Sequence, residues 1–316
     1  MGAIKNVALV GASGSLGTPV LNALVKSGSF NVTVLKRPSS TATFPASVDV
    51  RTADLSSKDS VVAALKGQDA VVSTVGIEAL PAQDILVEAA VAAGVKRFLP
   101  SDFGSNISIP KTAALPIFKS KVAIHEKLRE ASAATPTFTY TLVCSGAFLD
   151  WGLEHNFLLN WEETKPKLFD GGKNIFSATS LDSIGQAVVG VLSHPDETKN
   201  RFVQIKDIDI SQSQLLDIAK KVDPAKEWHD PIHIDTADLE RSSNESLAKG
   251  QISMPVMVGY IFRAIFGPAE YGSHFQTTDN ELLGLGGKDE ADVEAILRKL
   301  MLGRSSVEAQ GEKWLT

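Results

Sequence analysis

The first half of the chain alternates short β-branched runs with longer amphipathic runs. The short runs cover residues 6–10, 32–35, 70–74, 96–99 and 139–143, and amphipathic runs follow at 15–27, 82–93 and 117–131. This alternation is typical of β-α-β units, in which helices cover both faces of a parallel sheet. It predicts an α/β fold with a Rossmann-type doubly wound parallel sheet. Ligands of such sheets bind beyond the carboxyl ends of the strands, so the loops after the short runs are where a site is expected.

A glycine-rich turn follows the first predicted strand directly. Its pattern is G-x-x-G-x-x-G over residues 11–17, and the first helical run begins within it. Glycines let the backbone turn tightly and approach a diphosphate, and the N-terminus of a helix attracts negative charge. Glycines also mark ordinary turns, but the strand before and the helix after favour a dinucleotide-binding loop. The predicted binding residues are Gly11, Ser13, Gly14, Ser15, Leu16 and Gly17.

Two cations, Lys36 and Arg37, end the second predicted strand. An NAD site places an Asp or Glu at this position to hold the ribose 2′-hydroxyl, whereas a guanidinium pairs with a 2′-phosphate. The pair therefore predicts NADP(H) as the cofactor, with a solvated surface pair as the alternative. The ends of the next strands place Asp54 at adenine distance, and Thr74 and Val75 beside the nicotinamide ribose.

Charge and cysteine content exclude several other classes of protein. The net charge of −6 offers no basic face for a nucleic-acid backbone, and the single cysteine, Cys144, allows no internal disulfide. No apolar stretch is long enough to cross a bilayer. His229 and His233 have a ligand-like spacing, but Pro231 separates them and no third ligand is near, so no metal is expected. We expect a cytoplasmic monomer or homodimer that binds a small-molecule substrate, and neither nucleic acid nor a membrane.

The pattern of the chain changes after residue 145. Aromatic residues are frequent up to 176, and further helical patterns lie near 181–193, 211–221, 237–249 and 289–301. We expect an NADP-binding domain at 1–145, to which 177–195 returns. A smaller, mostly helical substrate lobe is then formed by 146–176 and 196–316. The apolar run 254–266 is interpreted as core, with a pocket wall as the alternative.

Further motifs complete a recognisable set. They are Arg37 after the second strand, Pro100-Ser101-Asp102-Phe103-Gly104 after the fifth, Phe118-Lys119-Ser120-Lys121 at the start of the next helix, and the weaker Asp182-Ser183-Ile184-Gly185. With the glycine pattern, they resemble the isoflavone reductase-like and NmrA-like branch of the atypical short-chain dehydrogenases. The stretch 147–152 is more similar to fungal members, and plant members usually carry Glu where this chain has Asp102.

The resemblance implies an NADPH-dependent reductase in which a helix lysine serves proton transfer. The Phe-x-x-Lys motif places that role on Lys121, which borders the cofactor together with Ser101 and Phe103. The Tyr-x-x-x-Lys arrangement of ordinary short-chain dehydrogenases occurs nowhere in the chain, which supports a mechanism without tyrosine. His125, one helical turn after Lys121, is interpreted as a surface histidine, with tuning of the lysine's charge as the alternative.

Aromatic residues are expected to wall a substrate site next to Phe103. Phe148, Trp151 and Phe275 are the candidates, because aromatic faces suit planar substrates and exclude water, with core packing as the alternative. His155 is a candidate donor to a substrate carbonyl. The predicted function is hydride transfer from NADPH to a conjugated or aromatic small molecule. The alternative is an NmrA-like redox sensor that binds NADP(H) without catalysis.

Overall fold

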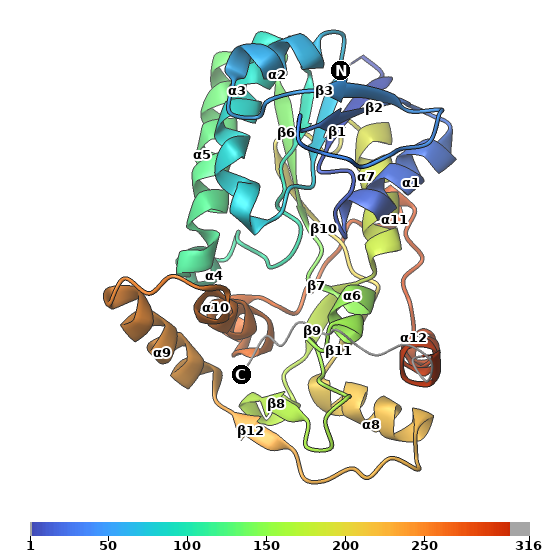
Figure 1. The fold of residues 1–316 in the computed structure, drawn as a ribbon, viewed down its shortest axis with the longest axis vertical. Coiled ribbons are helices and arrows are strands. Elements are labelled where there is room, and N and C mark those ends of the chain that lie inside the picture. Colours follow the sequence, from blue (N-terminus) through green and yellow to red (C-terminus); the bar gives the residue numbers. More distant parts are fainter. Residues whose placement is uncertain (1, 304–316) are drawn as a thin grey trace.

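The computed structural model describes residues 2–303, and its centre is a seven-stranded sheet in which every pair of neighbouring strands is parallel (Figure 1). The strand order is β10-β6-β5-β4-β1-β2-β3. The strands are β1 (Asn6–Val10), β2 (Asn31–Lys36), β3 (Asp49–Thr52), β4 (Ala70–Ser73), β5 (Arg97–Leu99), β6 (Thr139–Cys144) and β10 (Arg201–Gln204). The strand order reverses between β1 and β4, which is the topological switch point where such sheets bind ligands. The predicted Rossmann-type fold is confirmed.

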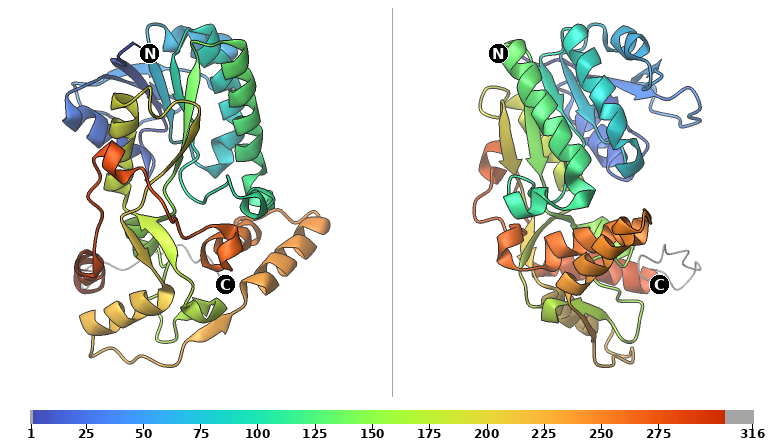
Figure 2. Two further views of the ribbon diagram at one scale, coloured as in Figure 1. Left: turned by 180° about the vertical axis from the view of Figure 1, so that it is seen from behind. Right: turned by 90° about the vertical axis from the view of Figure 1, so that its left-hand side faces the viewer.

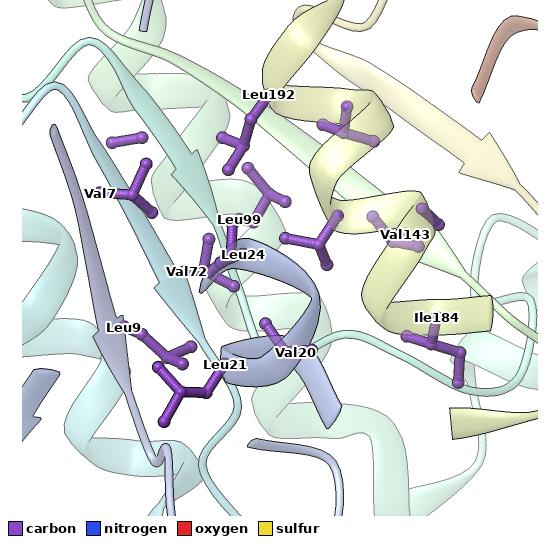
Figure 3. Close-up of a cluster of buried hydrophobic side chains, with 14 of the residues drawn as sticks. Val7, Leu9, Val20, Leu21, Leu24, Val72, Leu99, Val143, Ile184 and Leu192 are labelled. Carbon is purple, nitrogen blue, oxygen red and sulfur yellow. The ribbon is translucent and has the colours of Figure 1, made fainter. Parts of the chain in front are cut away.

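Helices cover both faces of this sheet. On one face lie α1 (Gly17–Ser27) and α7 (Leu181–Ser193), and on the other lie α2 (Lys58–Leu65), α3 (Gln83–Ala92) and α5 (Lys119–Ala134). Helix α1 turns Val20, Leu21 and Leu24 onto the strands, and Figure 3 shows them beside Ile184 and Leu192 of α7. Each fully buried side chain of this kind contributes about 1.5–3 kcal/mol to the free energy of folding. Helix α1 ends at Gly28, whose left-handed backbone (φ 62°) suits glycine.

The second lobe lies beyond the carboxyl ends of the strands (Figures 1 and 2). Its strands form two small sheets: β7 (Ala147–Phe148), β9 (Phe176–Thr179) and β11 (Ile208–Ile210) in one, and β8 (Lys167–Phe169) and β12 (Ile232–Ile234) in the other. Its helices are α6 (Leu149–Glu154), α8 (Gln212–Val222), α9 (Thr236–Ala248), α10 (Met254–Phe266) and α12 (Glu290–Gly303). Stacked rings of Phe169, Phe262 and Phe266 form the centre of its core.

The remaining helical segments are short. They are η1 (Ile77–Ala82), α4 (Pro110–Ala113), η2 (Pro116–Phe118), η3 (Asp170–Gly172), η4 (Ala269–Tyr271) and α11 (Asn280–Leu283). Within residues 2–303, no helix combines the length and the apolar character needed to cross a bilayer.

The chain passes from the sheet into the lobe and back again. Helix α7 packs against α1, and β10 also joins the main sheet, whereas the sequence assigned 196–316 to the lobe. The reason is that Arg201–Gln204 pairs in register with Thr141–Cys144. The buried Arg97 guanidinium ties this region together by donating to the hydroxyls of Thr139, Thr141 and Thr198. The exact division into two domains remains a proposal.

Candidate functional site

A cleft with a volume of about 730 Å³ opens at the carboxyl ends of β1, β2 and β4. The glycine loop, the end of β2 and the segment after β4 form its walls. The residues lining it are Val10, Gly11, Ala12, Ser13, Gly14, Val34, Leu35, Lys36, Arg37, Ser40, Phe44, Leu55, Thr74, Val75, Gly76, Ile77, Glu78, Ala79, Met254 and Pro255. The loops that the sequence predicted to bind a dinucleotide therefore line one cleft.

Close backbone approaches explain the spacing of the glycines. Gly11 has a left-handed backbone (φ 86°), and a Cβ there would lie 2.7 Å from the carbonyl oxygen of Thr74. A Cβ on Gly17 would lie 2.0 Å from the carbonyl oxygen of Gly11. The N–H of Gly14 donates to that same oxygen at 3.0 Å, which closes the turn before α1. No acidic side chain occupies the first turn of α1, so its N-terminal N–H groups suit a diphosphate.

The far end of the cleft carries the two cations at the end of β2. Lys36 is half-buried and Arg37 is exposed, and both line the cleft with Ser40. Their charge suits a second phosphate group.

Asp54, predicted to lie near an adenine, does not line the cleft. Its carboxylate instead accepts hydrogen bonds from the N–H and hydroxyl of Ser56 at 2.9 and 2.7 Å, which lower its pKa. The neighbouring Leu55 takes the place on the wall. An apolar side chain there suits the face of a base, so the sequence prediction was one residue away from the wall.

A second, mostly apolar cavity of about 380 Å³ adjoins the first. The two share Gly14, Thr74, Val75, Gly76, Ile77 and Met254. The other residues on its wall are Ser15, Leu16, Leu80, Ser101, Phe103, Gly104, Ser105, Ile117, Phe118, Lys121, Gly146, Ala147, Phe148, Trp151, Phe157, Val258, Ile261 and Ile265. Both the sheet loops and the lobe therefore contribute to its wall.

Lys121 is the cation on the wall of this second cavity. It lies in the first turn of α5, and its Nζ donates to the carbonyl oxygens of Asp102 at 2.7 Å and Phe103 at 3.4 Å. Burial lowers the pKa of Lys121, while the charge of Asp102 opposes that shift. A Cβ on Gly104, whose φ is 135°, would lie 4.0 Å from Nζ. A glycine at this position leaves space beside the amine.

The loop that holds Lys121 is itself fixed at Ser101. The hydroxyl of Ser101 donates to the carbonyl oxygen of Val75, and its N–H donates to Oε1 of the buried Gln83, both at 2.7 Å. These bonds join the loop after β5 to the segment after β4 and to α3. The predicted residues Thr74, Val75, Ser101, Phe103 and Lys121 are thus brought together.

His125 does not lie on the surface, so that expectation was wrong. Only 2% of the residue is exposed, because the face of α5 that carries it packs onto the sheet. Its Nε2 lies 2.8 Å from Oδ1 of Asp102, which is equally buried.

Three of the five predicted substrate residues line the second cavity: Phe103, Phe148 and Trp151. His155 lies outside the wall, where its ring stacks on Trp151 at a centroid distance of 4.5 Å. Phe275 is buried elsewhere. The segment around it runs beside β9, and its N–H donates to the hydroxyl of Ser177. We therefore leave Phe275 out of the site and treat His155 as a support for Trp151.

The sequence favoured core for the run 254–266, with a pocket wall as the alternative, and helix α10 provides both. Met254, Val258, Ile261 and Ile265 lie on one side of this helix and line the cavity, while Phe262 and Phe266 point into the core of the lobe. Helix α10 therefore serves as both core and pocket wall. The sequence alone could not separate the two roles, because apolar residues lie on both of these faces of the helix. Ile77, which lines both cavities, carried no signal in the sequence. Within residues 2–303, no group of three potential metal ligands is close enough to hold an ion.

Residues 4–227 match the model of the NmrA-like family. The chain is 35% identical over 308 residues to the oxidoreductase poxI of Penicillium oxalicum, an alignment that covers 92% of each protein. It is 32% identical over 297 residues to the oxidoreductase aprR of Aspergillus flavus, covering 93% of this chain and 98% of that protein.

Among solved structures, that of AtPrR2 with NADP+ and (+)pinoresinol has a similar fold. Its TM-score is 0.74 at 22% identity, with 95% of this chain and 100% of that chain covered. The resemblance found in the motifs is thereby confirmed, as is the likeness to fungal relatives. This chain belongs to the NmrA-like family.

Proposed function

We propose that this protein is an NADP(H)-dependent oxidoreductase. The glycine loop offers the backbone shape that a diphosphate needs, and Lys36 and Arg37 supply positive charge where a 2′-phosphate would lie. Two fungal relatives similar over nearly their whole length are named oxidoreductases, and the AtPrR2 structure holds NADP+. When bound, NADPH supplies a hydride.

The second cavity supports a conjugated or aromatic small molecule as substrate. It adjoins the cofactor cleft at Thr74–Ile77, where the nicotinamide end would lie, and aliphatic and aromatic side chains form most of its wall. A volume of about 380 Å³ is at the lower end of the range of ligand pockets. The aromatic faces of Phe148 and Trp151 suit a planar substrate and keep water from the reacting carbon.

Lys121 is the group we assign to the reaction. Negative charge develops on the substrate as it accepts a hydride, and an ammonium on the apolar wall stabilises that charge or donates a proton. Two of its N–H bonds are directed to the carbonyls of Asp102 and Phe103, which fixes the position of the amine. The third is left for the substrate.

The observation that carries this proposal is that Lys121 lines the second cavity, which adjoins the glycine-loop cleft at Thr74–Ile77. A screen of conjugated carbonyl and aromatic compounds, followed by the absorbance of NADPH, tests it. We expect oxidation of NADPH by the wild-type protein and its loss in Lys121→Met. Tight binding of NADPH without turnover of any compound would instead favour the redox sensor.

A further inference from the structure

Asp102 is held from two sides by residues one helical turn apart. The Nζ of Lys121 donates a hydrogen bond to the backbone carbonyl of Asp102 at 2.7 Å. The Nε2 of His125 lies 2.8 Å from Oδ1 of the same residue. Both residues belong to α5, and they point the same way because positions four apart share one face of a helix. Since an ionised carboxylate only accepts hydrogen bonds, Nε2 of His125 is the donor.

The His125–Asp102 pair is almost completely shielded from solvent. The side chains of His125 and Asp102 are 3% and 1% exposed. The ring of Phe202 meets the imidazole edge-on at a centroid distance of 5.4 Å. Among the residues that the structure describes, Oδ2 of Asp102 has no hydrogen-bond partner.

Stability alone does not explain such a carboxylate. An incompletely paired buried charge costs free energy, and an apolar pair of similar size would fill the space without that cost. Within residues 2–303, the hydrogen bond from His125 is also the only one that reaches the side chain of Asp102, whose backbone carbonyl in turn accepts from the amine of Lys121. A rotation of the Asp102 peptide would therefore move the acceptor of Lys121.

We propose that His125 is a positioning residue for Lys121: its hydrogen bond to the Asp102 carboxylate fixes the Asp102–Phe103 segment, whose two carbonyls hold the lysine amine at the cavity wall. The importance of this for turnover rests on the function proposed above. The positioning itself does not, and it is measurable without a substrate.

Two substitutions distinguish the effect of the His125–Asp102 hydrogen bond from the effect of packing against Phe202. His125→Gln places an amide N–H donor at about the reach of Nε2, whereas His125→Phe keeps an aromatic ring against Phe202 and removes the donor. The measurement is competitive acetylation of the full-length protein across a pH range, with a free lysine derivative as internal standard and peptide mass spectrometry to read Lys121.

In the wild type, burial lowers the pKa of Lys121. We expect His125→Phe to raise that pKa by about one pH unit, since the released carboxylate of Asp102 can meet the ammonium directly. His125→Gln keeps the wild-type value. An unchanged pKa in His125→Phe overturns the proposal. So does a folded His125→Gln protein with a raised pKa, which keeps the test decisive even where the Phe variant does not fold.

Turnover gives a second reading once a substrate is known. We expect His125→Phe to lower kcat about tenfold or more without changing the Kd of NADPH, and His125→Gln to restore most of kcat. Failure of the wild type to oxidise NADPH with any compound would remove the proposed function. The acetylation result would still decide whether His125 positions Lys121.

Discussion

The α-carbon of Gly17 lies against the carbonyl group of Gly11, so that a Cβ on Gly17 would lie 2.0 Å from its oxygen. The neighbouring atoms are backbone and cannot swing aside. We expect Gly17→Ala to lower the free energy of unfolding by about 3 kcal/mol, because the turn must open to admit the methyl group. Denaturant titration of the free protein measures this.

Gly14→Ala is the matched control in the same loop. Its Cβ would meet the oxygen of Gly11 at 3.4 Å, an ordinary contact, and would otherwise enter open space beside both cavities. We expect normal stability of the free protein and a marked loss of the thermal stabilisation by NADPH. Equal stability of the two variants would show that the Gly11–Gly17 contact does not limit the turn.

Arg37→Ala tests the cofactor preference. A charge-assisted contact with phosphate contributes about 1.5–3 kcal/mol, so we expect the Kd of NADPH to rise about 10- to 100-fold while that of NADH changes little. Calorimetry measures both. Arg241→Ala, which removes an exposed cation on α9, is the control and should leave both constants unchanged. Equal affinity of the wild type for NADPH and NADH would refute the NADP(H) assignment.

Lys121→Met and Lys119→Met form a second matched pair on α5. Lys119 is exposed and lies outside both cavity walls, whereas Lys121 lines the second cavity. We expect Lys121→Met to bind NADPH normally and to lose about two to four decades of turnover, because the cation near the reacting atoms is gone. Lys119→Met should stay active. Normal turnover by Lys121→Met on a substrate of the wild type would contradict the lysine-centred mechanism.

The lowered pKa of Lys121 predicts the direction of a pH effect. The proposed reaction needs the ammonium form of Lys121, which is lost as pH rises through that pKa. We therefore expect kcat to fall on the alkaline side at a pH below about 10.4, the value of an unperturbed lysine. In Lys121→Arg, the guanidinium stays charged, so whatever activity remains should lack this alkaline fall. A profile of kcat against pH for both proteins provides the measurement.

Trp151 and Phe266 distinguish the cavity wall from the core of the lobe. The ring of Trp151 is half-buried on the wall, between Phe148 and Phe157, while Phe266 is buried and stacks on Phe169 at 5.1 Å. We expect Trp151→Leu to raise KM about tenfold with a small change in Tm. Phe266→Leu should lower Tm and leave KM unchanged. A large loss of Tm with unchanged KM in Trp151→Leu would show that Trp151 is structural.

Local signals in the sequence sufficed for the sheet and the glycine loop, because strand period, helix period and turn glycines act over a few residues. Predicted residues that line the cavities directly after strands, such as Gly11 and Thr74, follow from these local signals. The sequence could not decide between core and pocket wall for Met254 and Ile261, since α10 reaches the cavity from a distant part of the chain. The burial of His125 was equally hidden, because it depends on which face of α5 meets the sheet.

The return of α7 and β10 to the sheet decides how this protein can be dissected. A fragment that stops at residue 145 would leave Val20 and Leu24 without the cover of α7, and β6 without its neighbour β10. It would also remove Thr198, one of the hydroxyls to which the Arg97 guanidinium donates. The shortest continuous fragment that contains the whole sheet runs to Gln204, and it necessarily carries Phe148 and Trp151 with it. The glycine-loop cleft therefore cannot be expressed with its whole sheet and without these two aromatic residues of the second cavity.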